Sequence, residues 1–191
     1  MANQRRWEVT EATWQVIIRD GLDRTSLRAI AQELGCTTGV VTHYFRNKEQ
    51  LILFALQQVT EELAKTMKKQ ATEREGLDKI YRMLSAFLPL DDHRQKLVRI
   101  WVAFLGYAVG RDYLLTEHKY HASRLHTIIK EELQELKAKN ILREELDLDS
   151  EVNSLLAFVN GMSLDNLIQQ NPLTPQLQEE YLNRYLKSVF N

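Results

Sequence analysis

The chain has 191 residues and a formal net charge of −1, from 25 lysines and arginines against 26 aspartates and glutamates. This balance excludes a general binder of polyanions, and residues 1–50 are also close to neutral, so any affinity for nucleic acid must come from a local motif. There are only seven glycines and three prolines, while leucine, glutamine, glutamate, lysine, arginine and alanine are abundant, so the composition favours long helices over sheets.

Nothing in the sequence indicates secretion or a membrane span. Residues 1–9 include two arginines, but the apolar segment of a secretion signal does not follow them. The longest run of low polarity, Ile100–Gly110, is far shorter than the ~20 residues that cross a membrane. Cys36 is the single cysteine, so an internal disulfide is impossible. We therefore expect a cytoplasmic protein.

Apolar residues recur every three to four positions through the whole chain, which predicts an all-α protein. The first helix should cover Arg5–Asp20, and two short helices and a fourth helix over residues 47–70 should follow it. Serine, threonine and asparagine favour helix starts, and glycine favours helix ends. The residues placed for these roles are Gly21, Thr25, Ser26, Gly35, Thr37 and Asn47.

The helices predicted in the rest of the chain are longer. They are Leu77–Leu88, Asp92–Val109, Asp112–Lys139, Ser150–Gln170 and Pro175–Phe190. We therefore expect about nine helices in two domains. The first is a small N-terminal domain over residues 1–50, and the second is a larger helical domain over residues 51–191. The fourth helix connects the two.

The most informative stretch is Thr25–Leu51, TSLRAIAQELGCTTGVVTHYFRNKEQL, which has the parts of a helix-turn-helix. This motif requires a support helix, a tight turn and a second helix whose exposed face fits a DNA major groove. Ala31 is small where the two helices must approach, and Gly35 allows the positive φ of the turn. Cys36 stands where a small apolar residue fills the corner. The stretch therefore predicts DNA binding.

Short polar side chains on the second helix can reach base edges or phosphates without holding the backbone away from DNA. Tyr44 and Lys48 suit phosphates, and Arg28 on the support helix suits a phosphate or a guanine edge. Two alternatives stay open: Tyr44 as part of the core, and Thr37 as a helix cap only. The predicted DNA-binding residues are Arg28, Thr37, Thr38, Gly39, Thr42, His43, Tyr44 and Lys48.

At these residues the chain resembles the TetR family of repressors over residues 5–60. The shared features are a capped support helix with an Ile-Ala pair, a glycine turn, a recognition helix ending in phenylalanine, and a Lys-Glu-x-Leu start to the next helix. Many members have tyrosine where this chain has Thr42, so a tyrosine contact is not carried over. Thr42 before His-Tyr-Phe, and RIWVAFLGYAV with Tyr120 and Arg124, are similar to the choline-responsive betaine-pathway branch.

The resemblance implies a ligand-regulated repressor without a cofactor or a catalysed reaction. A homodimer would bind double-stranded DNA at a palindromic operator. A small-molecule inducer would occupy the larger helical domain and reposition the two recognition helices through the fourth helix.

Aromatic residues in the middle of long helices indicate where an inducer would bind. The cavity would lie between the Leu77–Leu88, Asp92–Val109 and Asp112–Lys139 helices. Its aromatic rings suit either a cage for a quaternary ammonium or the wall of an apolar pocket, and plain core packing is the alternative. The predicted lining residues are Phe87, Trp101, Phe104, Tyr107, His121 and Asn160.

Two other classes of function stay open. One is a helical interaction module that has lost DNA binding. The other is a metal-dependent helical enzyme that uses His118 and His121, one helical turn apart. Two ligands without a clear third do not define a metal site, so we predict none. A redox-sensing role for Cys36 is the alternative to a small buried side chain.

The last two predicted helices carry more apolar surface than one chain can cover. In Pro175–Phe190 there are two apolar stripes. They consist of Leu177, Tyr181, Tyr185 and Val189, and of Leu182, Leu186 and Phe190. One stripe should face the same chain and the other a second copy. This predicts a two-fold dimer through a four-helix bundle, with recognition helices about 34–36 Å apart.

Overall fold

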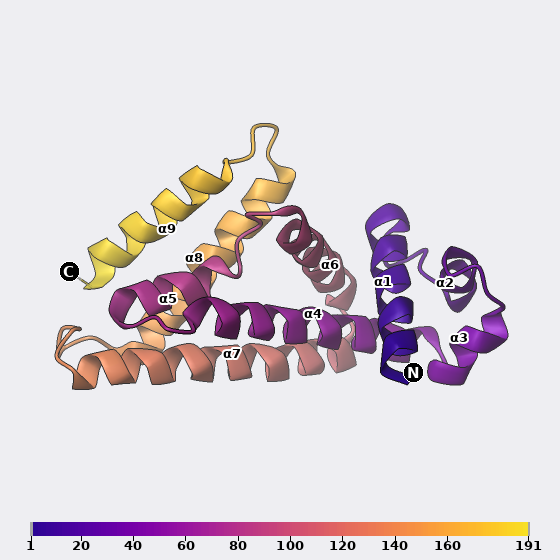
Figure 1. The fold of residues 1–191 in the computed structure, drawn as a ribbon, viewed down its shortest axis with the longest axis horizontal. Helices are drawn as coiled ribbons and strands as arrows, with labels where there is room; N and C mark the ends of the chain where they lie inside the picture. Colours follow the sequence, from indigo (N-terminus) through magenta and orange to yellow (C-terminus); the bar gives the residue numbers. More distant parts are fainter. Residues whose placement is uncertain (1, 191) are drawn as a thin grey trace. The chain divides into compact units, whose positions relative to one another are not determined.

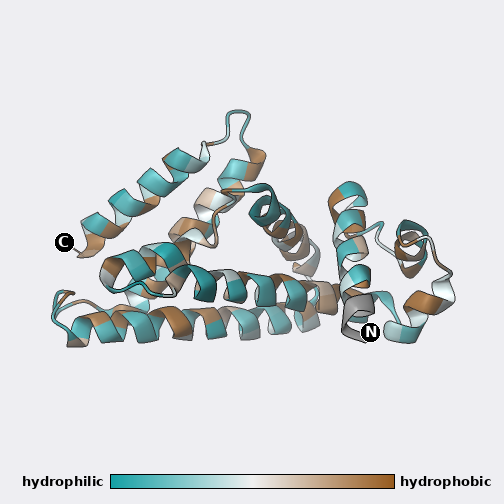
Figure 2. Ribbon diagram, in the orientation of Figure 1, coloured by the Kyte–Doolittle hydropathy of each residue, from teal (hydrophilic) through white to brown (hydrophobic). Residues whose placement is uncertain are grey.

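The computed structural model describes the backbone of residues 2–190 and the side chains of residues 7–190. Over this range the chain forms nine α-helices and no strand, so the all-α prediction is confirmed (Figure 1). Polar and apolar residues are interspersed along each of these helices, as Figure 2 shows. The helices are α1 Ala2–Asp20, α2 Leu27–Glu33, α3 Thr38–Tyr44, α4 Lys48–Ala71, α5 Gly76–Ser85, α6 Asp92–Ala108, α7 Asp112–Ala138, α8 Leu148–Ile168 and α9 Pro175–Phe190.

Three of the predicted cap and turn residues mark helix boundaries in the structure. Ser26 Oγ accepts a hydrogen bond from the Ala29 backbone N–H at 3.1 Å, so it caps α2. Asn47 Oδ1 accepts one from the Gln50 N–H at 2.9 Å at the start of α4. Gly35 has φ +62°, a left-handed conformation that glycine adopts without steric cost, and the chain turns there from α2 to α3.

Among the boundaries that differ from the prediction, two have a clear local cause. Helix α5 ends at Ser85, because the next residues leave the α-helical pattern: the Phe87 and Leu88 N–H groups donate to carbonyls three residues back. Helix α8 starts two residues before the predicted Ser150. Asp147 caps it, accepting the N–H of Asp149 at 3.3 Å. Both shifts are set by local hydrogen bonds at the helix ends, which apolar periodicity does not report.

The chain divides into two compact units. The N-terminal unit consists of Met1–Glu61 and Arg99–Glu117, and the C-terminal unit of Glu62–Val98 and His118–Asn191. The unit that contains the helix-turn-helix therefore extends beyond the predicted 1–50 domain. It also includes the first part of α4, the end of α6 and the start of α7.

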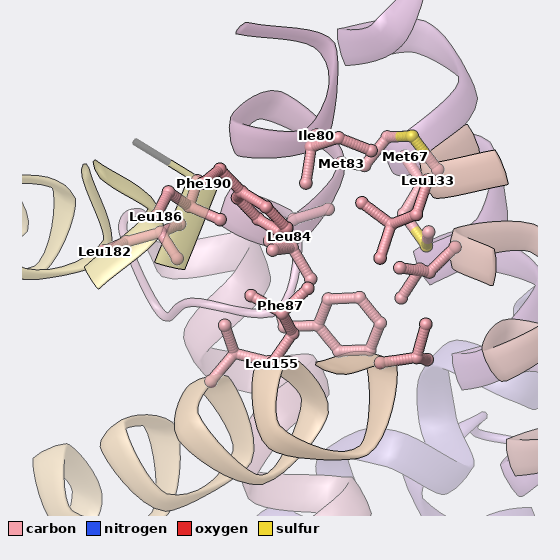
Figure 3. Close-up of a cluster of buried hydrophobic side chains, with 14 of the residues drawn as sticks. Met67, Ile80, Met83, Leu84, Phe87, Leu133, Leu155, Leu182, Leu186 and Phe190 are labelled. Carbon is pink, nitrogen blue, oxygen red and sulfur yellow. The ribbon is translucent and has the colours of Figure 1, made fainter. Parts of the chain in front are cut away.

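Each unit has its own apolar core. In the N-terminal unit α1, α2, α3 and α4 bury the side chains of Val9, Ala12, Val16, Ile30, Ala31, Val41, Phe45 and Leu51. In the C-terminal unit α5 packs with α8 and α9. Figure 3 shows Leu84 and Phe87 beside Leu155 of α8 and the α9 residues Leu182, Leu186 and Phe190. Ser163 Oγ also donates to the Phe87 carbonyl at 2.8 Å.

Among the described residues, no helix combines the length and the apolar character that crossing a membrane requires.

Candidate nucleic-acid interface

Helices α2 and α3 pack closely, as a helix-turn-helix requires. Ile30, Ala31 and Val41 are almost completely buried at their contact. The Cys36 N–H donates to the Ala31 carbonyl at 2.9 Å, which closes the turn after Gly35. The Cys36 side chain is half-buried and packs against the N-terminal core. The turn is therefore fixed by backbone hydrogen bonds and by small side chains.

The predicted DNA-binding face of α3 is exposed. Thr37, Thr38, Gly39, Thr42 and His43 are all exposed, and so is Arg28 on α2. Thr37 is the N-cap residue of α3, but its side chain makes no capping hydrogen bond. Its hydroxyl is therefore not used by the cap. Thr42 Oγ1 donates to the Gly39 carbonyl at 3.1 Å, which leaves the oxygen lone pairs of Thr42 available.

Tyr44 is partly a core residue, and its contact with a phosphate stays a prediction. It is half-buried and packs against the N-terminal core. Its ring meets the His43 ring edge to face, with centroids 5.1 Å apart. The core contact orients the phenol at the end of α3, and its partial exposure leaves that group accessible to a partner.

Lys48, the first residue of α4, is held by two contacts from distant parts of the sequence. Its Nζ donates to the Asp23 carbonyl at 2.9 Å, before α2. The same Nζ lies 5.4 Å from the centroid of the Tyr107 ring in α6. The sequence predicted Lys48 as a phosphate ligand but neither partner. Both contacts are long-range in sequence, so no local pattern indicates them.

An ion-pair cluster ties α1 to α2. Arg19 Nη1 lies 2.6 Å from Glu33 Oε2, and Arg19 Nη2 lies 3.0 Å from Asp20 Oδ2. The hydrogen bond from Arg19 lowers the pKa of the Asp20 carboxyl. The cluster is largely solvent-exposed, so it contributes little to the stability of the fold.

The residues predicted to line a ligand cavity do not all belong to one unit. Trp101, Phe104 and Tyr107 lie in the N-terminal unit, and Phe104 is fully buried there. The other three, Phe87, His121 and Asn160, lie in the C-terminal unit. Phe87 is part of the C-terminal core shown in Figure 3, and His121 is buried.

Two family models match the sequence in the regions just described. Residues 9–54 match the N-terminal model of "Bacterial regulatory proteins, tetR family". Residues 76–191, more than half of the chain, match "BetI-type transcriptional repressor, C-terminal". The chain belongs to the TetR family. The helix-turn-helix of this TetR-family regulator is therefore its DNA-binding element, and its C-terminal region is of the BetI type.

Relatives and a solved structure match the chain over almost its whole length. The regulator is 27% identical to the HTH-type transcriptional regulator PksA of Bacillus subtilis, covering 97% of this chain and 90% of that protein. It is 25% identical to the HTH-type transcriptional regulator BetI of Vibrio vulnificus, covering 98% and 93%. A putative regulator of Saccharomonospora viridis, solved in complex with choline, has a TM-score of 0.86 at 18% identity, covering 98% and 97%.

The C-terminal unit of the regulator contains a surface groove of about 470 Å³ between α4, α5 and α7. Met67 and Met83 lie among its apolar lining residues, and Lys79 Nζ lies 2.6 Å from Glu132 Oε2 on its polar side. None of the six residues predicted for the ligand cavity lines this groove.

The histidines of α7 form no metal centre in the part of the chain that the structure describes. No group of three or more histidine, cysteine, aspartate or glutamate side chains is placed there to hold a metal ion. Burial lowers the pKa of His118, and the charge of the neighbouring His121 lowers it further. His126 Nε2 lies 3.9 Å from Asp149 Oδ1, as an ordinary surface pair.

Proposed function

We propose that this protein is a homodimeric repressor that binds a palindromic operator through α3 and is released by a small-molecule inducer. One observation carries the proposal: α3 sits on a fully packed helix-turn-helix and exposes a face of short polar side chains. Such a face fits a major groove and places hydroxyl and imidazole groups at base edges.

Gly39 supports a close approach to DNA. It is exposed in the first turn of α3, and a Cβ added there would meet only Thr37 Oγ1, at an ordinary 3.6 Å. Glycine inside a helix costs roughly 1 kcal/mol relative to alanine. The protein's own packing does not require glycine at this position. A partner that must approach the backbone closely would explain the glycine, because a Cβ at position 39 would be in its way. The DNA backbone or a base edge is such a partner.

Lys48 and Thr42 have different roles in this proposal. Lys48 binds a phosphate, so Lys48→Ala should weaken binding to all duplexes by roughly five- to tenfold and lower the salt slope by about one. Thr42 faces base edges, so Thr42→Ala should change the preferred sequence and leave the salt slope unchanged. Fluorescence anisotropy with operator and scrambled duplexes at several salt concentrations measures both effects.

Lys65→Ala is the matched control, because Lys65 is an exposed lysine of α4 that pairs with Glu62. It should bind DNA as the wild type does. Equal affinity and equal salt slope for Lys48→Ala and the wild type would eliminate the Lys48 phosphate contact.

The dimer proposal rests on α8 and α9. On α9 the stripe of Leu182, Leu186 and Phe190 is buried in the protomer, while the other stripe stays partly exposed. On α8 Leu164 and Ile168 are 39% and 69% exposed. Gly161 is exposed on the same helix, and no atom lies within 4 Å of a Cβ added there. These features fit close packing of α8 and α9 against the same helices of a second copy.

The inducer proposal rests on the BetI-type C-terminal region and on the choline complex of the structural neighbour. We propose a quaternary ammonium ligand, and Trp101 of the N-terminal unit is the candidate residue that we test for its site. If choline is the inducer, it should lower operator affinity, and bound operator should lower choline affinity by the same factor.

Tryptophan fluorescence and calorimetry measure choline binding with and without operator. Trp101→Leu should weaken choline binding at least roughly tenfold, because cation–π attraction is lost. Ile141→Ala, at an exposed position in the loop before α8, is the control. Unchanged choline binding in Trp101→Leu would show that Trp101 is not part of the ligand site.

A further inference from the structure

Three side chains meet where α4 begins and α6 ends. The Tyr107 ring lies 5.4 Å from Lys48 Nζ, and the same ring lies 3.9 Å from Arg111 Cζ. All three residues belong to the N-terminal unit. Both cations are within the range at which an aromatic ring attracts a positive charge. Tyr107, predicted from the sequence to line a ligand cavity, lies beside a predicted DNA contact.

The position of Tyr107 is fixed by the way α6 ends. Gly110 has φ +80°, and the Arg111 N–H donates to the Ala108 carbonyl at 2.9 Å. The Arg111 guanidinium donates to the Tyr107 carbonyl. Arg111 therefore satisfies one of the last carbonyls of the helix and packs on the ring of the same residue. Arg111 thus restrains Tyr107 in two ways, through the backbone carbonyl and through the face of the ring.

Lys48 is restrained before any phosphate arrives. Of its three N–H donors, one goes to the Asp23 carbonyl, and the ring of Tyr107 attracts the ammonium as a whole. A free lysine side chain loses substantial rotamer entropy when it binds, and a restrained one has already lost part of it. The contacts leave donors for a phosphate while they limit where the ammonium can be.

We infer that Tyr107 is a positioning residue for DNA binding: its ring, held by Arg111, keeps the Lys48 ammonium where an operator phosphate meets it. The inference rests on the proposed phosphate contact of Lys48. The end of α6 would then contribute directly to operator affinity. Movement of this helix end would change the restraint on Lys48 without displacing α3.

The test compares Tyr107→Phe, Tyr107→Leu and Tyr107→Ala in the full-length protein, with an operator duplex and a salt series. Tyr107→Phe keeps the aromatic face and should bind within about twofold of the wild type. Tyr107→Leu keeps the bulk but not the ring, and both it and Tyr107→Ala should weaken binding about three- to tenfold. Their salt slopes should stay unchanged, because Lys48 still reaches the phosphate. Tyr120→Ala, an exposed tyrosine of α7 in the C-terminal unit, is the control.

A double-mutant cycle with Lys48→Ala separates this inference from the function on which it rests. In the Lys48→Ala background, Tyr107→Leu should have less than about a twofold effect, because there is no ammonium to position. The same loss in both backgrounds would overturn the inference, and so would wild-type affinity of Tyr107→Leu. If Lys48→Ala itself changes neither affinity nor slope, the phosphate contact fails and the inference falls with it.

Discussion

Replacing Leu164 and Ile168 together with glutamate should convert the protein to a monomer and lower operator affinity by at least about a hundredfold. These residues are the exposed apolar side chains of α8, beside the open surface at Gly161. In the dimer the new carboxylates would be removed from water without cationic partners, which costs far more than the apolar contacts contribute. A monomer binds one half-site only. It therefore lacks the added affinity that a dimer obtains by binding both half-sites of one operator.

Sedimentation velocity at micromolar concentration and anisotropy with a full operator measure the two effects. Ile128→Glu combined with Ile141→Glu is the matched control, since these isoleucines are similarly exposed but lie on α7 and in the loop before α8. The control should remain a dimer with wild-type affinity. A dimer that persists in the Leu164→Glu, Ile168→Glu variant would show that α8 does not form the interface.

Leu84→Ala should lower the free energy of unfolding by about 2–5 kcal/mol, since it removes a fully buried side chain and leaves a cavity. Leu84 lies on α5, and Leu155 of α8 and Leu182 of α9 belong to the same core (Figure 3). All three are completely buried. The cavity would open where α5, α8 and α9 pack together, so collapse around it is restricted.

Urea denaturation at one fixed protein concentration measures this loss, because dimerisation makes stability depend on concentration. Ile141→Ala, at a 43% exposed position, is the control and should change stability by less than roughly 0.5 kcal/mol. A loss below about 1 kcal/mol for Leu84→Ala would mean that the C-terminal core tolerates the cavity by rearrangement.

The helices and the helix-turn-helix were predictable because their determinants are local. Apolar spacing, the Ser26 and Asn47 caps and the positive φ of Gly35 all act within a few residues, and the structure contains each of them. Two of the boundaries that differ from the prediction, at Ser85 and Asp147, depend on individual hydrogen bonds that a periodic pattern does not encode.

The arrangement of the long helices was not predictable in the same way. An aromatic residue at helical spacing can line a cavity or fill a core, and periodicity is the same in both cases. Phe87 is a core residue in the structure, and Tyr107 meets Lys48 from a distant part of the sequence. Tertiary packing decides between these two roles. A single sequence does not show which distant residues pack together, so it does not indicate the role.

A dimer of this protein should read a palindromic DNA sequence through α3. Selection of bound duplexes from a random pool, using the full-length protein, tests it most directly. We expect an inverted repeat whose half-sites are centred about 10 base pairs, or a multiple of that, apart. Thr42→Ala should select altered half-sites with the same spacing. Recovery of no enriched sequence, or of a single unrepeated site, would contradict the account.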